Sequence, residues 1–483
     1  MKSLKFLALA AIAAAFAQQA SAQTTVYITG STAFRTAAIA AINTVTGLSA
    51  PSGSDASYSA TFYPKGQTAT STRNTTFIWS GGSVSGNPVT VKAAFTGSAS
   101  GVGTTLGNLA IPFLPDGVTG ATNPSAYIDV QGSLPNINTQ TFTAQDNSTQ
   151  HGIYDPSVQQ VPNIAFSDAF QASTPFAAGV TKTLLAPFNT TVTFPAAAHD
   201  ASVGFVTFKI VASTGFPLGT GGTGVSEAPF TGSYTVSSYS AEPNTLGALF
   251  STGSVPLSRF TGSTLDLHKL VYATGRNPDS GTRIGFLADT GFGINNTVVQ
   301  YQPTVGATPV TTITRYPIEI VAGSSTSSNG NSGEATGGTL RAYMGDTIAT
   351  GASLSIVNGA RTAAQSSTVT AAYFLTYLGT GDASSVAGTA VELSYKGVPF
   401  SLQAIYNGQY TYWAQEHIFD NGTTGVVDTF RTTLISTLQG TATPLSNAGI
   451  SQGDLYNSST NPTGPFLFTR SADGGRISTL YTP

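Results

Sequence analysis

The sequence TGRNPDSGT at residues 274–282 is the stretch on which the interpretation of this chain depends. It follows a short apolar run at 270–273 that predicts a strand, and it precedes residues 284–287, which predict the start of a helix. The first backbone N–H groups of a helix have no internal partner, and the helix dipole puts partial positive charge there. A strand that ends in a small-residue turn and opens a helix is therefore a place where an anion can bind.

Four residues of this turn suit an anionic ligand. Ser280 and Thr282 add hydroxyl donors, and Gly281 lets the backbone come close to a ligand. Arg276 offers a planar fork that fits two oxygens of one oxyanion. The alternative is a polar strand-to-helix turn, in which Ser280 caps the helix and Arg276 forms a salt bridge with Asp279.

Three further predicted strands end in small polar residues. The strand at 24–28 leads into Gly-Ser-Thr-Ala-Phe at 30–34 and a helix, which Ser31 or Thr32 can cap and Gly47 can end. The strand at 88–95 runs into a turn at 96–102 that contains Ser98, and the strand at 161–166 ends in Ser167-Asp168. Asp168 could instead cap a helix. Strands alternating with helices predict an α/β fold with a mostly parallel sheet, in which ligands lie beyond the carboxyl ends of the strands.

The rest of the chain gives weaker signals. We expect strands at 202–212, 371–374 and 391–395. We expect helices at 245–250 and 427–438, and another that begins after 359 and ends before the strand at 371–374. A loose tail should follow the last helix. Residues 48–85 and 103–160 resemble β-rich or irregular insertions, and 303–345 contains a flexible polar tip. Aromatic residues near 405–413 predict core packing or a carbohydrate-stacking surface; they are Tyr406, Tyr410, Tyr412 and Trp413.

Composition restricts the function classes. Charged residues are only 8% of the 483, the formal net charge is −3, and cysteine is absent. These values argue against a basic face for nucleic acid and exclude disulfides, a thiol nucleophile and a lipid anchor on cysteine. The four histidines form no metal-spaced pair, and no hydrolase or P-loop motif is found. We therefore expect no enzyme activity, no metal and no cofactor.

The N-terminus predicts an exported protein. Lys2 and Lys5 precede an apolar run at 6–16 and the sequence Ala20-Ser21-Ala22, as in a secretory signal peptide cleaved after Ala22. No later apolar run is long enough to span a membrane. We expect residues 23–483 to be soluble, in the periplasm or secreted.

The order of these motifs resembles the substrate-binding proteins of phosphate ABC transporters, which have the type 2 periplasmic binding protein fold. The matching segments are 30–34, 97–102, 166–168 and the Arg-x-x-x-Ser-Gly-Thr pattern at 276–282. The resemblance implies two α/β lobes closing on an oxyanion. Lobe 1 would comprise residues 23–212 and 396–483, with insertions at about 48–85 and 103–160. Lobe 2 would comprise residues 213–395, with a flexible insertion at about 303–345.

The resemblance also implies the ligand residues. They are Ser31, Thr32, Ala33, Phe34, Ser98, Asp168, Arg276, Ser280, Gly281 and Thr282. Two positions depart from the family pattern, because its first-turn threonine falls on Ala33, and the aspartate expected after Arg276 is displaced to Asp279.

Two function classes remain open. The first is a monomeric solute-binding protein that captures phosphate or a related oxyanion and delivers it to an ABC transporter permease in the membrane. The second is a secreted or cell-surface structural or adhesive protein that reuses this fold with a degraded site. The ordered turns favour the first class, and the low charge with long Ser/Thr/Gly-rich insertions favours the second.

Overall fold

The fold is described from a computed structural model. The structure describes residues 23–55, 76–122, 159–184, 188, 190–220, 223–226, 233–303, 309–316, 330–334, 336–358, 361–440, 450–451 and 468–479. The expected signal peptide at 1–22 lies outside these residues. So do 56–75 and 123–158 of the expected insertions, and most of the expected polar tip.

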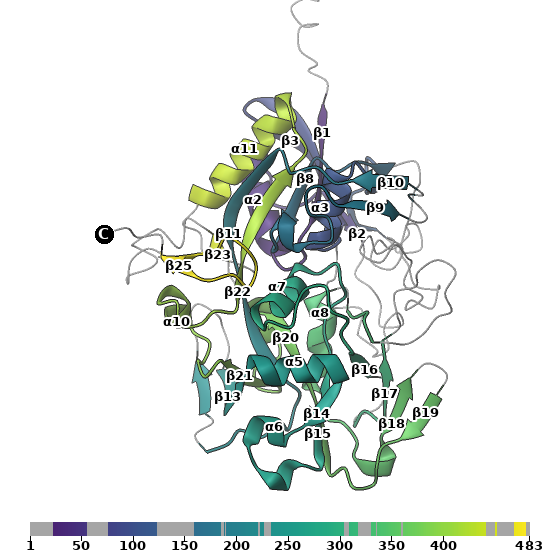
Figure 1. The fold of residues 1–483 in the computed structure, drawn as a ribbon. Coiled ribbons are helices and arrows are strands. Elements are labelled where there is room, and N and C mark those ends of the chain that lie inside the picture. The colour runs from purple at the N-terminus through teal and green to yellow at the C-terminus, as the bar shows by residue number, and fades with distance from the viewer. Residues whose placement is uncertain are drawn as a thin grey trace, which may run out of the picture.

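One large mixed sheet runs through the molecule, and the long strand β11 (His199–Ala212) lies in its middle and joins its two halves (Figure 1). Its first residues pair with β22 (Trp413–Asp420). Its last residues pair with β20 (Ala371–Gly379) and β21 (Val391–Tyr395). We call the strands on the β22 side the first half of the sheet and those on the β20 and β21 side the second half.

The first half continues from β22 in the order β8, β1, β4, β3, β2, β6. These strands are β8 (Ile164–Ser167), β1 (Thr24–Gly30), β4 (Asn87–Ala94), β3 (Thr76–Val84), β2 (Gly53–Asp55) and β6 (Gly120–Thr122). The second half adds β15 (Lys269–Ala273), β14 (Ser254–Pro256), β13 (Ser233–Ala241) and β12 (Thr223–Ser226). The short strand β23 (Ile450–Ser451) also pairs with β11. The expected lobe boundaries stay a prediction.

Helices cover both halves of the sheet. In the first half, α2 (Arg35–Thr46) packs against α11 (Gly425–Gly440), and α3 (Ser98–Leu106) packs on β8 and β1. In the second half, α7 (Gly281–Asp289) packs on β20 and also reaches β22. The shorter helices are α5 (Pro243–Thr252), α6 (Ser258–Thr261), α8 (Gly337–Leu340), α9 (Thr380–Ser384) and α10 (Leu402–Tyr406). Among the described residues, none of the helices has the length and hydropathy needed to cross a membrane.

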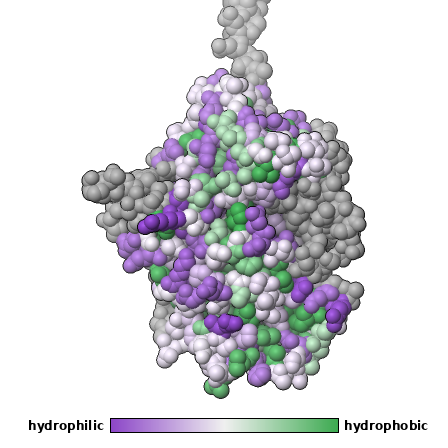
Figure 2. Space-filling view, in the orientation of Figure 1, coloured by the Kyte–Doolittle hydropathy of each residue, from purple (hydrophilic) through white to green (hydrophobic). Residues whose placement is uncertain are grey.

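Smaller sheets flank the large one. They are the hairpin β9 (Thr181–Leu184) and β10 (Thr190–Thr193), the pair β5 (Ile111–Pro112) and β7 (Gln159–Gln160), the pair β24 (Phe468–Thr469) and β25 (Ser478–Thr479), and the sheet of β16 (Tyr301–Pro303), β17 (Thr312–Arg315), β18 (Ser355–Asn358) and β19 (Arg361–Ala364). Figure 2 shows pale, weakly polar residues over much of the visible face, with purple and green residues interspersed among them. This matches a chain with only 8% charged residues.

The α/β class is confirmed, but the sheet is mixed rather than mostly parallel. The strand β1 pairs in parallel with β4 and β8. Every described pairing of β11 is antiparallel, because its neighbours return along the strand that joins the two halves. Alternation of strands and helices along the sequence cannot reveal that reversal.

Several local predictions are confirmed and others are wrong. The helices at 245–250 and 427–438 lie within α5 and α11, and Gly47 ends α2 with a φ of 70°. The helix expected after 359 is wrong, because residues 361–364 form the exposed strand β19, which pairs with β18. The helix α3 was not expected: its glycines lower helix propensity, yet its packing on β8 and β1 favours the helix.

The aromatic residues near 410 are core. Tyr410, Tyr412 and Trp413 are at most 2% exposed, whereas the side chain of Tyr406 lies outside the described residues. Tyr412 contacts Phe208, with ring centroids 5.0 Å apart. The carbohydrate-stacking alternative is therefore wrong for the three described rings.

Substitution of Gly30 tests how closely the ends of β1 and β8 must approach each other. Its φ is +112°, and a Cβ atom there would overlap the backbone of Phe166. We expect Gly30→Ala to lower the free energy of unfolding by roughly 3 kcal/mol or more. Gly47→Ala is the matched control, because Gly47 has a φ of +70° and an added methyl group there would meet nothing within 4 Å. It should cost only about 1 kcal/mol. Urea denaturation measures both, and equal losses would contradict the close approach.

Candidate functional site

Residues from four of the predicted turns meet between the two halves of the sheet. Thr32 follows β1, Ser98 begins α3 after β4, and Asp168 follows β8. From the second half, Arg276 follows β15 and Thr282 lies in the first turn of α7. The carboxyl ends of parallel strands thus place these side chains at one location, as the sequence predicted for ligands of such sheets.

The carboxylate of Asp168 joins the two halves. Its Oδ1 accepts a hydrogen bond from the Ser98 hydroxyl of the first half, and its Oδ2 accepts one from the Thr282 hydroxyl of the second half at 3.0 Å. Asp168 is 1% exposed. Burial raises the pKa of Asp168, whereas the two hydroxyl bonds and the nearby positive charge of Arg276 lower it. Asp168 does not cap the next helix, the short turn at Gln171–Ser173, whose N-cap residue is Phe170.

The guanidinium of Arg276 also connects the two halves of the sheet, but it reaches from the second half to the first. Its Nη2 donates to the hydroxyl of Thr32 in the first half at 3.0 Å, and its Nε donates to the carbonyl of Glu334 at 3.0 Å. Arg276 is 3% exposed. Burial lowers its pKa, and the negative charge of Asp168 opposes that shift. The arginine is thus a buried cation whose fork lies across the junction between the two halves.

The other predicted ligand residues have local roles. Ser280 caps α7, because its hydroxyl oxygen accepts from the backbone N–H of Arg283 at 3.3 Å. Gly281 passes so close to Asp168 that a Cβ atom would overlap the carboxylate. The hydroxyl oxygen of Ser31 accepts from the N–H of Phe34 at 3.2 Å in the turn before α2.

The remaining two residues of the first turn differ in exposure. Phe34 is fully buried in the hydrophobic core, while Ala33 is half-buried and packs against that core. The helix α2 begins at Arg35, with Phe34 at the capping position, so neither Ser31 nor Thr32 is the cap residue itself.

Sequence reasoning missed Glu334. Its backbone forms a bridge with Arg276, and its carbonyl accepts from the arginine Nε. Its carboxylate accepts hydrogen bonds from Tyr316 and Tyr343, each at 2.6 Å. Glu334 is 3% exposed, so this part of 303–345 is not a flexible tip. Its polar, glycine-rich surroundings in the sequence give no periodic signal of burial.

Two further carboxyl groups lie near Asp168. Glu416 in β22 is fully buried, and Asp473, which is half-buried, comes from the segment expected to be a loose tail. Oδ2 of Asp473 accepts from the backbone N–H of Phe170 at 2.9 Å. Burial raises the pKa of Asp473 to about 6, and the charge of Asp168 adds to this effect. Nothing in the sequence near 416 or 473 indicates a role, because the contacts join segments far apart in the chain.

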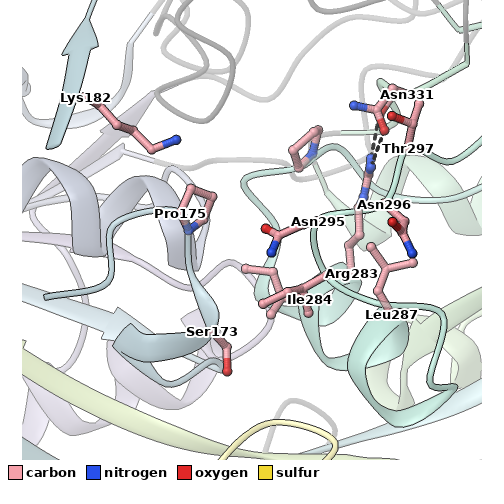
Figure 3. Close-up of a pocket in the computed structure, with 12 residues that line it drawn as sticks. Ser173, Pro175, Lys182, Arg283, Ile284, Leu287, Asn295, Asn296, Thr297 and Asn331 are labelled. Carbon is pink, nitrogen blue, oxygen red and sulfur yellow. Dashed lines mark hydrogen bonds between the residues drawn. The ribbon is translucent and has the colours of Figure 1, made fainter. Parts of the chain in front are cut away.

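A cavity of about 200 Å³ opens beside the candidate site (Figure 3). Lys182 and Pro175 line one side, and Arg283, Asn295 and Asn296 line the other. Arg283 is held by Asn331, to whose backbone and side-chain oxygens it donates at 2.6 and 2.7 Å. Burial lowers the pKa of Lys182. None of the ten predicted ligand residues lines this cavity, so it lies next to the Asp168 and Arg276 contacts rather than at them.

A metal centre is not indicated in the part of the chain that the structure describes. No group of three or more histidine, aspartate and glutamate side chains there could hold a metal ion.

The buried carboxyl groups predict how stability depends on pH. A carboxyl whose pKa is raised on folding stabilises the fold fully below its unfolded pKa of about 4, and that contribution is lost as the pH rises through the folded pKa. For Asp473 the loss should occur between about pH 4 and 6. We expect Asp473→Asn to reduce the fall in unfolding free energy across this range by about 1–3 kcal/mol.

Urea denaturation at pH 4, 5, 6 and 7 measures this effect. Asp266→Asn is the control, because Lys269 lowers the pKa of Asp266, which therefore contributes in the opposite direction. A decline that is as steep in Asp473→Asn as in the wild type would contradict the assignment.

The comparisons with known proteins found similarity to this chain only among solved structures. No protein-family model and no curated protein matches this sequence. A candidate phosphate ABC transporter substrate-binding protein with bound phosphate from Clostridium perfringens is 10% identical, with a TM-score of 0.39 over 89% of this chain and 99% of that chain. An ABC-type phosphate transport receptor from Vibrio cholerae is 10% identical, with a TM-score of 0.35 over 85% of this chain and 93% of that chain. PstS from Borrelia burgdorferi is 10% identical, with a TM-score of 0.31 over 86% of this chain and 98% of that chain. These values are too low to assign a ligand or a role to this chain.

Proposed function

We propose that this protein captures phosphate or a related protonated oxyanion between the two halves of its sheet, as an exported solute-binding protein. The observation that carries the proposal is the pair of reciprocal contacts across the junction. Arg276 of the second half bonds Thr32 of the first, and Thr282 of the second half bonds Asp168 of the first. An anion held by these groups would touch both halves and so favour their closed arrangement.

The donors suit a tetrahedral oxyanion. Arg276 supplies one buried positive charge in a planar fork. The Thr32 hydroxyl bonds this arginine, and the Ser98 and Thr282 hydroxyls bond Asp168. The N-terminus of α7 adds backbone N–H groups. Such neutral donors bind an oxyanion without requiring a matching number of positive charges.

Asp168 supports phosphate over sulfate. Phosphate at neutral pH carries a proton that it can donate to a carboxylate, whereas sulfate carries none and would be repelled. In this structure Ser98 and Thr282 donate to Asp168. Each hydroxyl has one hydrogen, so binding requires these hydroxyls to turn from Asp168 to the ligand.

The same contacts favour a second candidate, a structural or adhesive protein with a degraded site. The Asp168 carboxylate is itself an anion already held by the hydroxyls that an external oxyanion would need. In that case these contacts hold the two halves of the sheet together and bind no ligand. Delivery to an ABC transporter permease belongs to the first candidate alone.

Calorimetric titration with phosphate, with sulfate as the competing anion, separates the two candidates. We expect the wild type to bind phosphate at least 100-fold more tightly than sulfate. Arg276→Ala should weaken phosphate binding by about 100-fold, since a charged hydrogen-bonding group contributes about 3 kcal/mol. Arg259→Ala, at an exposed position in α6, should leave the affinity unchanged. A folded wild type that binds neither anion would sink the capture proposal.

Thr282→Val tests what the hydroxyl on Asp168 does. Valine keeps the shape but removes the donor, so the buried carboxylate loses one of its two hydroxyl bonds. We expect the unfolding free energy to fall by about 1–3 kcal/mol, together with a tenfold or greater loss of phosphate affinity.

Thr290→Val at the C-cap of the same helix is the control, since among the described residues the Thr290 hydroxyl bonds the α7 carbonyls of Phe286 and Leu287. It should not change phosphate binding. Loss of stability in Thr282→Val without phosphate binding by the wild type would leave the structural candidate in place.

A further inference from the structure

Glu416 lies beside Asp168 at the end of the sheet strands. The strand β22 lies between β11 and β8 (Figure 1), and its His417 pairs with Ser167, the last residue of β8. Continuing this antiparallel register by one residue places Glu416 next to Asp168. On its other side Glu416 pairs with Gly204 of β11, which has no side chain. The carboxyl group therefore belongs to the same strand ends that carry the candidate site.

The Glu416 side chain is buried and has no hydrogen-bond partner of normal geometry among the described residues. It is 0% exposed, and neither carboxyl oxygen is bonded to a described residue, although the Ser31 hydroxyl is close enough to interact. An ionised carboxylate in such surroundings costs several kcal/mol, so the neutral acid is favoured. Burial, and then the charge of Asp168, raise the pKa of Glu416 well above its ordinary value.

The groups that face Glu416 set its response to pH. Asp168 is the acid that interacts with it, from the end of β8, and Ser31 is the hydroxyl, from the turn after β1. The helices α3 and α7, which also pack on β22, bring Ser98 and Thr282, both bonded to Asp168.

Neighbouring charges are engaged elsewhere. Arg283 of α7 donates to Asn331, and His417, the next residue in β22, bonds Asp200 at 2.7 Å. The charges of His417 and Asp168 act on Asp473. Arg276 is the cation whose positive charge acts on Asp168.

We propose that Glu416 is a second acid of the candidate oxyanion site, and that the site holds its anion only while Glu416 carries its proton. This inference rests on the proposed function. The neutral acid supplies an O–H donor at the edge of the site, next to the acceptor Asp168. Once ionised, it adds a second carboxylate charge that repels the bound anion across a buried, weakly screened distance.

The sign of the pH dependence follows from these charges. Below the pH at which Glu416 loses its proton, the protein binds the anion with its full affinity. Above that pH, affinity in the wild type falls by up to tenfold per pH unit, because binding requires the protonated fraction. A glutamine at this position stays neutral at every pH and keeps an N–H donor, so its affinity lacks this loss.

The experiment is calorimetric titration of the full mature chain with inorganic phosphate at pH 6, 7, 8 and 9. We compare the wild type with Glu416→Gln, and we use the ratio of their affinities because the titration of phosphate itself cancels from it. The ratio of variant to wild type should be lowest at pH 6 and rise with the pH as the wild type loses the Glu416 proton. Glu242→Gln, at an exposed position before α5, is the control and should give a ratio of one throughout.

The outcomes separate this inference from the function on which it rests. Phosphate binding with a ratio that stays constant from pH 6 to 9 overturns the role of Glu416 and leaves oxyanion capture standing. A wild type that binds no phosphate at any of these pH values overturns both. Should Glu416→Gln not fold, Glu416→Met replaces it as a neutral side chain of similar volume, and the same rise in the ratio is required.

Discussion

The structure depends on a buried carboxylate that is shared between two halves of one sheet. Asp168 is 1% exposed, and its oxygens accept hydroxyl bonds from Ser98 on one side and Thr282 on the other. A charge in this position requires donors, because an unpaired buried carboxylate would shift towards its neutral form. The need for these donors holds the turn after β4 and the start of α7 against the end of β8. Gly281 permits the contact, since any side chain there would overlap Asp168.

Arg276 is held with comparable precision on its own side of the junction. Its backbone N–H donates to the Tyr377 hydroxyl at 3.2 Å, and its Nε donates to the Glu334 carbonyl. Glu334 is in turn fixed by two tyrosine hydroxyls. The arginine is therefore fixed in one position by contacts within the protein, and in the proposed function this preorganisation lowers the conformational entropy cost of binding. The polar insertion that contains Glu334 thus supports the site and is not merely a surface decoration.

The candidate site brings several acidic side chains close together. Asp168, Glu416 and Asp473 are neighbours in space, and burial raises the pKa of each. One arginine cannot neutralise three ionised carboxylates, so burial favours the protonated form of these acids. As the pH rises and they lose their protons, the same groups lower the stability of the fold.

The sequence by itself determined the local elements and the chemistry at their ends. Strand–turn–helix patterns located Thr32, Ser98, Asp168, Arg276 and Thr282, because periodic apolar runs and capping residues act over a few neighbours. Only the tertiary structure decided that the sheet is mixed, that Asp168 bonds to Thr282, and that Glu334, Glu416 and Asp473 lie at the site. Those contacts join segments up to about three hundred residues apart, such as Phe170 and Asp473. Local propensity contains no information on such pairs, whereas burial against a distant strand or turn fixes them.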